Sequence, residues 1–155
     1  MRSKSFQWAA LFLFFHAGLS GQTAVLDSLR SVYLASQSDS AFWYNSCLLG
    51  AVFFRSDLDS ALRYSEISLD YAHKTGAHNM IASSELTIGA VFQYKDEREK
   101  AIEWYLKAHE TSKSGKQKRT EAVALGNIGL LYSELRDPGK AVYYLKQSLE
   151  IMLEI

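Results

Sequence analysis

An internal repeat of 40 residues constrains this chain more than any other feature. Three segments share an alanine that opens a helix-like pattern, at Ala61, Ala101 and Ala141. Each alanine is followed by an aliphatic residue after one position, an aromatic residue after three and a small residue after seven. Because offsets of 0, 3 and 7 lie on one face of a helix, each segment predicts an amphipathic α-helix. Units of this length that repeat at a fixed period indicate a solenoid, in which each unit packs only on its neighbours.

A glycine pattern precedes each alanine and completes the unit. An aliphatic residue, a glycine and, three positions later, an aromatic residue recur around Gly50, Gly89 and Gly129. A glycine inside a helix is less favourable than alanine by about 1 kcal/mol. Three glycines at one register therefore need a reason, and a close approach between two helices supplies it. The sequence predicts pairs of helices, a first helix with the glycine and a second helix opened by the alanine.

The residues between the helices fit this division. Asp137 is expected to cap the last helix, with a proline in its first turn. Asp96 and Glu99 resemble a capping box, and glycines at Gly76 and Gly115 suit left-handed C-terminal caps. We predict helices over residues 24–36, 39–55, 58–75, 78–95, 98–114, 117–135 and 138–155, and no strand.

Residues 127–151, NIGLLYSELRDPGKAVYYLKQSLEI, resemble a tetratricopeptide repeat. In that family helix A carries a small residue and then an aromatic one, and helix B opens with alanine. The resemblance implies an all-α fold, a right-handed superhelical solenoid of antiparallel helix pairs. The chain departs from the family in its period, which is about 34 residues in the usual repeat. Repeats of this greater length are similar to those of bacterial signalling proteins and kinesin light chains. Two residues also depart from the pattern, since Ser65 replaces a bulky residue and Glu85 replaces an apolar one.

The chain is predicted to consist of a signal peptide and a repeat array. Arg2 and Lys4 precede an apolar run over 6–15 and then small residues, which is the order of regions in a secretory signal peptide. Cleavage near residues 18–22 would export the protein to the periplasm or the medium; the alternative is a buried N-terminal helix. The run is too short to span a bilayer, which needs roughly 20 residues. The predicted parts are a signal peptide (1–21), a leading helix (22–38) and three repeats (39–77, 78–116 and 117–155).

The resemblance implies that a protein or peptide binds along the concave face lined by helix A. In related arrays an asparagine at the register of Asn127 bonds the backbone of a bound peptide; the alternatives are a surface residue or a cap on a neighbouring turn. The basic pairs that grip a free C-terminus in some family members are absent from this face. The candidate residues on it are Tyr44, Cys47, Ala51, Ser83, Leu86, Thr87, Ala90, Gln93, Tyr94, Val123, Asn127, Leu130 and Glu134.

Other classes of function find little support in the sequence. The formal net charge is zero, which argues against nucleic-acid binding. Cys47 is the only cysteine, so neither an intrachain disulfide nor a thiol metal cluster can form. No catalytic constellation, metal motif or phosphate loop occurs, and we expect no enzyme activity and no cofactor. The aromatic residues Tyr64, Trp104 and Tyr144 are interpreted as core between repeats.

The sequence therefore predicts an interaction scaffold that acts outside the cytoplasm. The alternative is the N-terminal sensor region of a longer bacterial signalling protein, with a histidine kinase or helix-turn-helix output domain. The last helix carries Leu149, Met152, Leu153 and Ile155, which would leave apolar surface bare. This surface would be covered by further chain, by a partner helix or by self-association. Attachment to a membrane is expected only if a longer chain exists.

Overall fold

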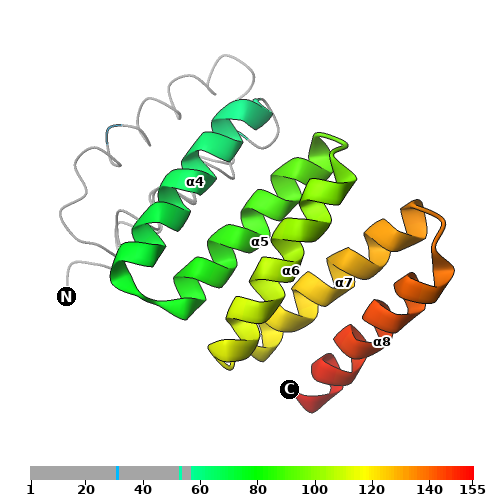
Figure 1. Ribbon diagram of the computed structural model, residues 1–155. Coiled ribbons are helices and arrows are strands. Elements are labelled where there is room, and N and C mark those ends of the chain that lie inside the picture. The colour runs from blue at the N-terminus through cyan, green and yellow to red at the C-terminus, as the bar shows by residue number, and fades with distance from the viewer. Residues whose placement is uncertain (1–30, 32–52, 54–56) are drawn as a thin grey trace, which may run out of the picture.

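The computed structural model describes residues 57–155, together with residues 31 and 53, and all structural statements below concern these residues (Figure 1). This part of the chain contains five consecutive helices and no strand. They are α4 (Leu58–Thr75), α5 (His78–Tyr94), α6 (Arg98–Ser114), α7 (Lys118–Glu134) and α8 (Pro138–Glu154). Turns of two or three residues join them, so neighbouring helices are antiparallel. The all-α solenoid is confirmed, and the predicted bounds of these five helices agree within one residue at every end.

The helices follow one another with a regular local geometry. Helices α5 to α8 have 17 residues each and begin at 20-residue intervals. In each three-residue turn between them the middle residue is left-handed, with φ of 62° at Asp96, 57° at Lys116 and 57° at Arg136. The next backbone N–H then donates to a carbonyl five residues earlier, as from Asp137 to Tyr132 at 2.9 Å. The 40-residue repeat thus consists of two similar helix-and-turn units, and each turn satisfies carbonyls at the helix end.

The caps agree with the sequence prediction in part. The Asp137 side chain accepts a hydrogen bond from the Lys140 backbone N–H at 3.1 Å, and Gly76 is left-handed with φ of 67°. The capping box at Asp96 is wrong, because helix α6 begins one residue later than that motif requires and its N-cap is Glu97. The left-handed cap at Gly115 is also wrong, because the left-handed residue of that turn is the following lysine.

Close helix approach occurs at both glycines that the structure describes. A Cβ added to Gly89 would lie 2.6 Å from the Tyr105 Cδ1 atom, and one added to Gly129 would lie 2.7 Å from the Leu145 Cγ atom. Each of these contacts joins helix A to helix B of the same repeat. The alanines Ala61, Ala101 and Ala141 are buried at the start of the second helices. Gly50 lies outside the described residues.

The aromatic stripe does not form the core between repeats. The buried positions of α4 and α6 have offsets of 0, 4, 7 and 11 from the alanine, so the aromatic residue at offset 3 is only half-buried. Tyr144 stacks on Tyr132 of the same repeat at 5.6 Å between ring centroids. Trp104 instead faces the Lys107 ammonium group at 4.0 Å. Tyr144 nevertheless packs against the core cluster formed by α6 and α7, so the stripe lies at the edge of the core and not in its centre.

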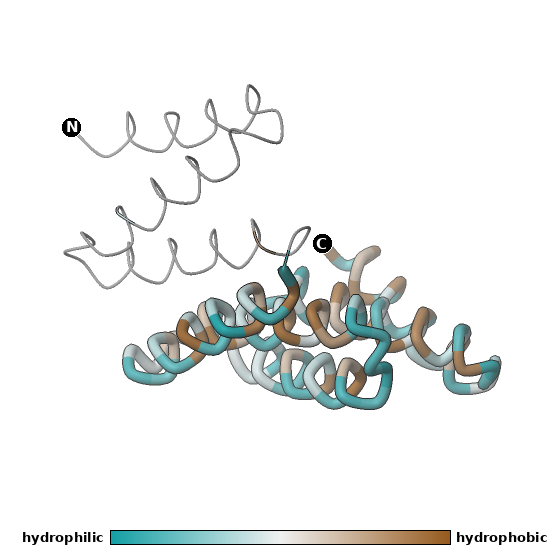
Figure 2. The backbone as a smooth tube through the Cα atoms, turned by 90° about the horizontal axis from the view of Figure 1, so that it is seen from above, coloured by the Kyte–Doolittle hydropathy of each residue, from teal (hydrophilic) through white to brown (hydrophobic). Residues whose placement is uncertain are grey.

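The interior differs between the two ends of the helices. The apolar end lies beside the turns 95–97 and 135–137 and holds a cluster made of Ala101, Ile102, Tyr105, Ile128 and Leu131. The polar end lies beside the turns 76–77 and 115–117, and it contains the buried polar residues of α5, α6 and α7, which are Ser84, Glu85, Ser112 and Glu121. Between helices, polar residues gather in the turns (Figure 2).

Candidate functional site

One exposed face runs across the first helices of the two repeats that the structure describes in full. The sequence places residues of α5 and α7 on this face at offsets of 0, 4, 7 and 11, and these two helices contact each other. We call it the helix-A face, and it consists of Ser83, Thr87, Ala90 and Tyr94 on α5 and Val123, Asn127, Leu130 and Glu134 on α7. Six predicted binding residues, Thr87, Ala90, Tyr94, Asn127, Leu130 and Glu134, thus share one surface. The candidates Tyr44, Cys47 and Ala51 lie outside the described residues.

The helix-A face presents its largest side chains as exposed apolar groups and carries little charge. The side chains of Tyr94 and Leu130 are 69% and 52% exposed, and Val123 is exposed as well. Glu134 is the one formally charged residue of the eight, and its Oε2 atom accepts a hydrogen bond from the Arg98 Nε atom at 3.1 Å. Large exposed apolar side chains on a folded surface are typical of binding sites.

A tyrosine behind this face connects its two helices. Tyr105 on α6 is buried against the glycine of α5, and its hydroxyl donates to the Gln93 Oε1 atom at 2.8 Å. Burial raises the pKa of Tyr105, and the side-chain hydrogen bond from Asn127 opposes that rise in pKa. The hydroxyl is therefore protonated at neutral pH and donates its hydrogen to the side-chain amide of Gln93. Asn127 is half-buried within α7.

Sequence analysis did not identify the link through Tyr105. The sequence places Gln93 and Asn127 on the binding face, whereas Tyr105 stands at the bulky position of the repeat pattern, where the first repeat has Ser65. A polar tip on that bulky residue was the available signal, since a buried tyrosine hydroxyl usually finds a hydrogen-bond partner.

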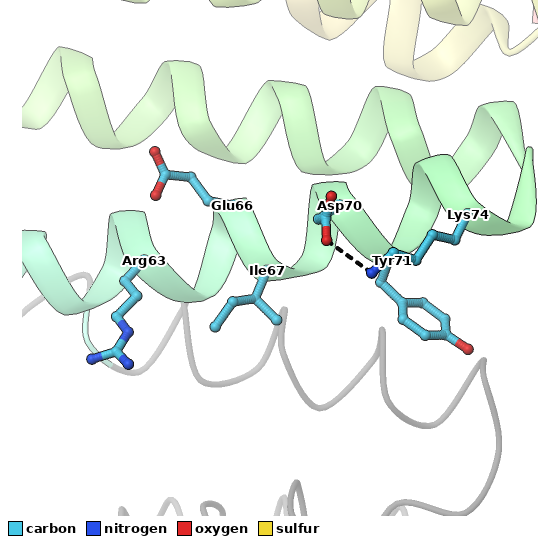
Figure 3. Close-up of a pocket in the computed structure, with 6 residues that line it drawn as sticks. All are labelled: Arg63, Glu66, Ile67, Asp70, Tyr71 and Lys74. Atoms are coloured by element: carbon cyan, nitrogen blue, oxygen red, sulfur yellow. Dashed lines mark ion pairs between the residues drawn. The ribbon is translucent and has the colours of Figure 1, made fainter.

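A second surface lies along α4 (Figure 3). It is lined by Arg63, Glu66, Ile67, Asp70, Tyr71 and Lys74. An exposed ion pair of 3.0 Å joins Asp70 and Lys74. All six of these described lining residues come from α4.

Over 57–155 no group of three or more His, Cys, Asp or Glu side chains could hold a metal ion. None of the helices in this range has both the length and the apolar character that a membrane-crossing segment requires.

Comparisons with known proteins identify the repeat. Residues 80–154 match the family model described as tetratricopeptide repeat, so this part of the chain consists of tetratricopeptide repeats. No curated protein sequence matches the chain.

Several solved structures have a similar fold. The apo form of RapI superimposes with a TM-score of 0.81 at 19% identity, over 95% of this chain and 54% of that one. The tetratricopeptide repeat domain of Arabidopsis FLU gives a TM-score of 0.69 at 19% identity, over 76% of this chain and 100% of that one. A Rap protein complexed with competence and sporulation factor gives 0.74 at 16% identity, over 94% of this chain and 42% of that one. These identities show the fold alone, and the chain spans about half or less of the two Rap proteins.

Proposed function

We propose that this tetratricopeptide scaffold binds a peptide or an extended protein segment along its helix-A face, the concave side of the array. The observation that carries the proposal is the combination of exposed apolar side chains at Tyr94 and Leu130 with two half-buried amide side chains, Gln93 and Asn127, on the same two helices. Apolar side chains supply most of the affinity of such a surface, whereas amides can bond a ligand backbone. A Rap protein of similar fold is complexed with competence and sporulation factor, which supports a binding role for this architecture.

The chemistry of the face indicates what kind of segment would bind. Glu134 is its one charged residue, and its carboxylate is already paired with Arg98. A strongly charged segment would therefore lose hydration without gaining an ion pair. We propose that the ligand is a mainly uncharged segment with apolar side chains, and that the protein has no catalytic role, no cofactor and no nucleic-acid partner.

Replacement of Asn127 tests this function directly. The full chain would be used to select peptides from a random 12-residue phage library, and the affinity of a synthetic selected peptide would be measured by fluorescence anisotropy. Asn127→Ala should weaken binding about fivefold to tenfold, the usual effect of one lost hydrogen bond. The control Glu99→Gln changes an exposed residue of α6 and should leave affinity unaltered. Equal affinity of Asn127→Ala and the unaltered protein would contradict the proposed site.

The location of the protein is a separate proposal. Arg2, Lys4 and the apolar run over 6–15 support export and cleavage near residues 18–22. Mass spectrometry of the mature N-terminus in fractionated cells would test it. An uncleaved chain recovered with the cytoplasmic proteins would contradict export.

A second candidate function is supported by the uncovered face of α8. Ile102 and Tyr105 of α6 are 8% and 1% exposed beneath α7, whereas their equivalents Val142 and Leu145 of α8 are 64% and 38% exposed. We propose as the alternative that this chain is the sensor region of a longer signalling protein, or that it self-associates through α8. An immunoblot of fractionated cells separates these options, because a band much larger than 17.5 kDa favours the longer protein. Light scattering of the purified chain at two concentrations detects self-association.

A further inference from the structure

We propose that the exposed face of α8 binds the same face of a second copy of this chain, with the two α8 helices side by side and antiparallel. This inference rests on the second candidate function above, and it names the partner, the direction and the register of the contact. The binding face consists of the exposed residues Val142, Leu145, Leu149 and Met152, and we call it the α8 seam.

The α8 seam lies where apolar surface gathers in the described part of the chain. Six of the eleven large apolar side chains that are exposed over 57–155 belong to α8, so this helix and not the array as a whole presents the apolar patch. Helix α8 packs on α7 and lies at the end of the row of described helices (Figure 1). The four residues of the α8 seam are 38% to 64% exposed. A contiguous apolar patch of this kind on a folded surface marks an interaction site.

A comparison with α6 indicates that the α8 seam differs from the surface that joins the repeats. Helix α6 presents polar groups to α7 at its polar end, where the His109 Nδ1 atom lies 3.8 Å from the Glu121 Oε1 atom. In α8 the positions of His109 and Ser112 are occupied by Leu149 and Met152. A helix with the sequence pattern of α7 would therefore bury the carboxylate equivalent to Glu121 against leucine, without a polar partner. The α8 seam instead fits a helix that is apolar over the whole contact.

The spacing of the α8 seam is the same in both directions along the helix. Its residues are separated by three, four and three positions, which is the spacing of the apolar stripe where two helices pair. When a second α8 runs in the opposite direction, Val142 lies level with Met152 of the second copy, and Leu145 lies level with Leu149 of the second copy. Each residue of the seam then meets another apolar residue, with the two-fold symmetry of most homodimers. Helix α8 thus supplies both sides of a complete contact.

The charges of α8 favour the antiparallel direction. Its basic residues, Lys140 and Lys146, lie in the first half of the helix, and its acidic residues, Glu150 and Glu154, lie in the second half. All four side chains are exposed. At the register given above Lys140 is level with Glu154 of the second copy, whereas a parallel pair would place like charges side by side. Charges that flank an apolar stripe select the direction in which two helices pair.

Substitutions in the α8 seam test whether this face forms the contact. Sedimentation equilibrium of the purified full chain at a series of concentrations should show monomers in equilibrium with dimers. Leu149→Asn places an amide in the seam of both copies and should raise the dissociation constant of the dimer about hundredfold or more. Val142→Asn is a second seam variant and should act in the same direction. Leu135→Asn changes an exposed leucine outside the seam and should leave the dissociation constant unaltered; circular dichroism checks that each variant keeps its helices.

Disulfide cross-linking tests the direction and the register. Cys47→Ser first removes the native thiol, and copies carrying Val142→Cys are then mixed with copies carrying Met152→Cys and oxidised. The two introduced thiols should lie opposite each other and form a mixed disulfide. Two copies that both carry Val142→Cys should stay unlinked, because their thiols would be about 15 Å apart along the helix axis, beyond the reach of a disulfide.

Each result decides a different part of the proposal. A monomer at every concentration would overturn self-association itself. A dimer that both Leu149→Asn and Val142→Asn leave intact would place the contact elsewhere, and a disulfide between two Val142→Cys copies would show a parallel pair. Either of these last two results would overturn the antiparallel α8 contact and leave self-association standing. Peptide binding on the helix-A face is measured separately and does not depend on any of these outcomes.

Discussion

The apolar end and the polar end of the helices are built from the same segments but differ in what they bury. Helices α6 and α7 supply Ile102 and Ile128 to the apolar end, and they supply Ser112 and Glu121 to the polar end. Burial of aliphatic side chains stabilises a fold by about 1.5–3 kcal/mol each, whereas a buried polar group must find a partner to avoid a penalty. The comparison indicates that the apolar end provides most of the stability.

Glu85 illustrates the loss of stability that a buried polar group causes at the polar end. Its side chain is buried, and its Oε2 atom has no hydrogen-bond partner among the described residues. Burial raises the pKa of Glu85, although a hydrogen bond with Thr111 and the charges of His73 and Lys107 act in the opposite direction on the pKa. The equivalent residue one repeat later is Leu125, which is buried at the same register without this penalty. At this position the second repeat is therefore less stable than the third.

The largest expected effect comes from a cavity at the apolar end. Ile128→Ala removes a fully buried side chain of the core cluster and should lower the free energy of unfolding by about 2–5 kcal/mol. The matched change at the polar end is Ser112→Ala, which removes a buried hydroxyl bonded to the His109 carbonyl at 2.9 Å. It should lower stability by at most about 1 kcal/mol. Urea denaturation of the full chain measures both, and equal losses would refute the difference between the ends.

The glycine contact gives the next largest effect. Gly89→Leu forces a side chain into the buried ring of Tyr105 and should destabilise the array by about 1–3 kcal/mol through overpacking. Gly126→Ala is the control, since an added Cβ would meet only the Ser148 Oγ atom at 3.3 Å and the helix would gain propensity. Thermal unfolding distinguishes the two. A melting temperature of Gly89→Leu equal to that of the unaltered protein would show that the close approach has no energetic role.

Replacement of the buried carboxylate should strengthen the polar end. Glu85→Leu should raise stability at pH 7 by about 1–2 kcal/mol, because it removes a buried group with an unsatisfied oxygen. The pKa of Glu85 is raised in the folded state, so the folded protein binds this proton more tightly than the unfolded chain does. Stability of the unaltered protein should therefore fall as pH rises from about 4.3, the ordinary glutamate pKa, through the raised pKa.

The pH dependence provides the check on this prediction. The advantage of Glu85→Leu should be largest at neutral pH and smallest at about pH 3, well below the ordinary glutamate pKa, where the carboxyl is protonated in both states. Unfolding by urea at several pH values measures the difference, and Glu99→Gln, a change at an exposed residue of α6, should show no such trend. An advantage that stays constant with pH would mean that packing, not the charge, separates Glu85 from leucine.

Features that depend on helical periodicity could be predicted from the sequence, whereas features that depend on contacts between neighbouring helices could not. The 40-residue register was sufficient for the helix bounds and for the close contacts at Gly89 and Gly129. The aromatic stripe was misplaced because offsets 3 and 4 both fit a helical period, and only the packing of adjacent helices decides between them. The hydrogen bond from Tyr105 to Gln93 joins different helices, so no local pattern predicts it.

The prediction of a glycine cap failed at the three-residue turns for a local reason. Substitutions in these turns should have the smallest effect on stability. The left-handed positions are occupied by Asp96, Lys116 and Arg136, so the usual glycine signal is absent where it would matter. Left-handed backbone disfavours residues with a Cβ atom by roughly 1–2 kcal/mol, and glycine loses part of this advantage through its greater freedom in the unfolded chain. Lys116→Gly at the polar end and Arg136→Gly at the apolar end should each raise stability by about 0.5–1 kcal/mol. Because the strain is local to each turn, the two gains in stability should be equal, even though the two ends differ in their interiors. Thermal unfolding measures both gains. A gain at one end alone would mean that the packed core, and not the turn, determines the backbone conformation there.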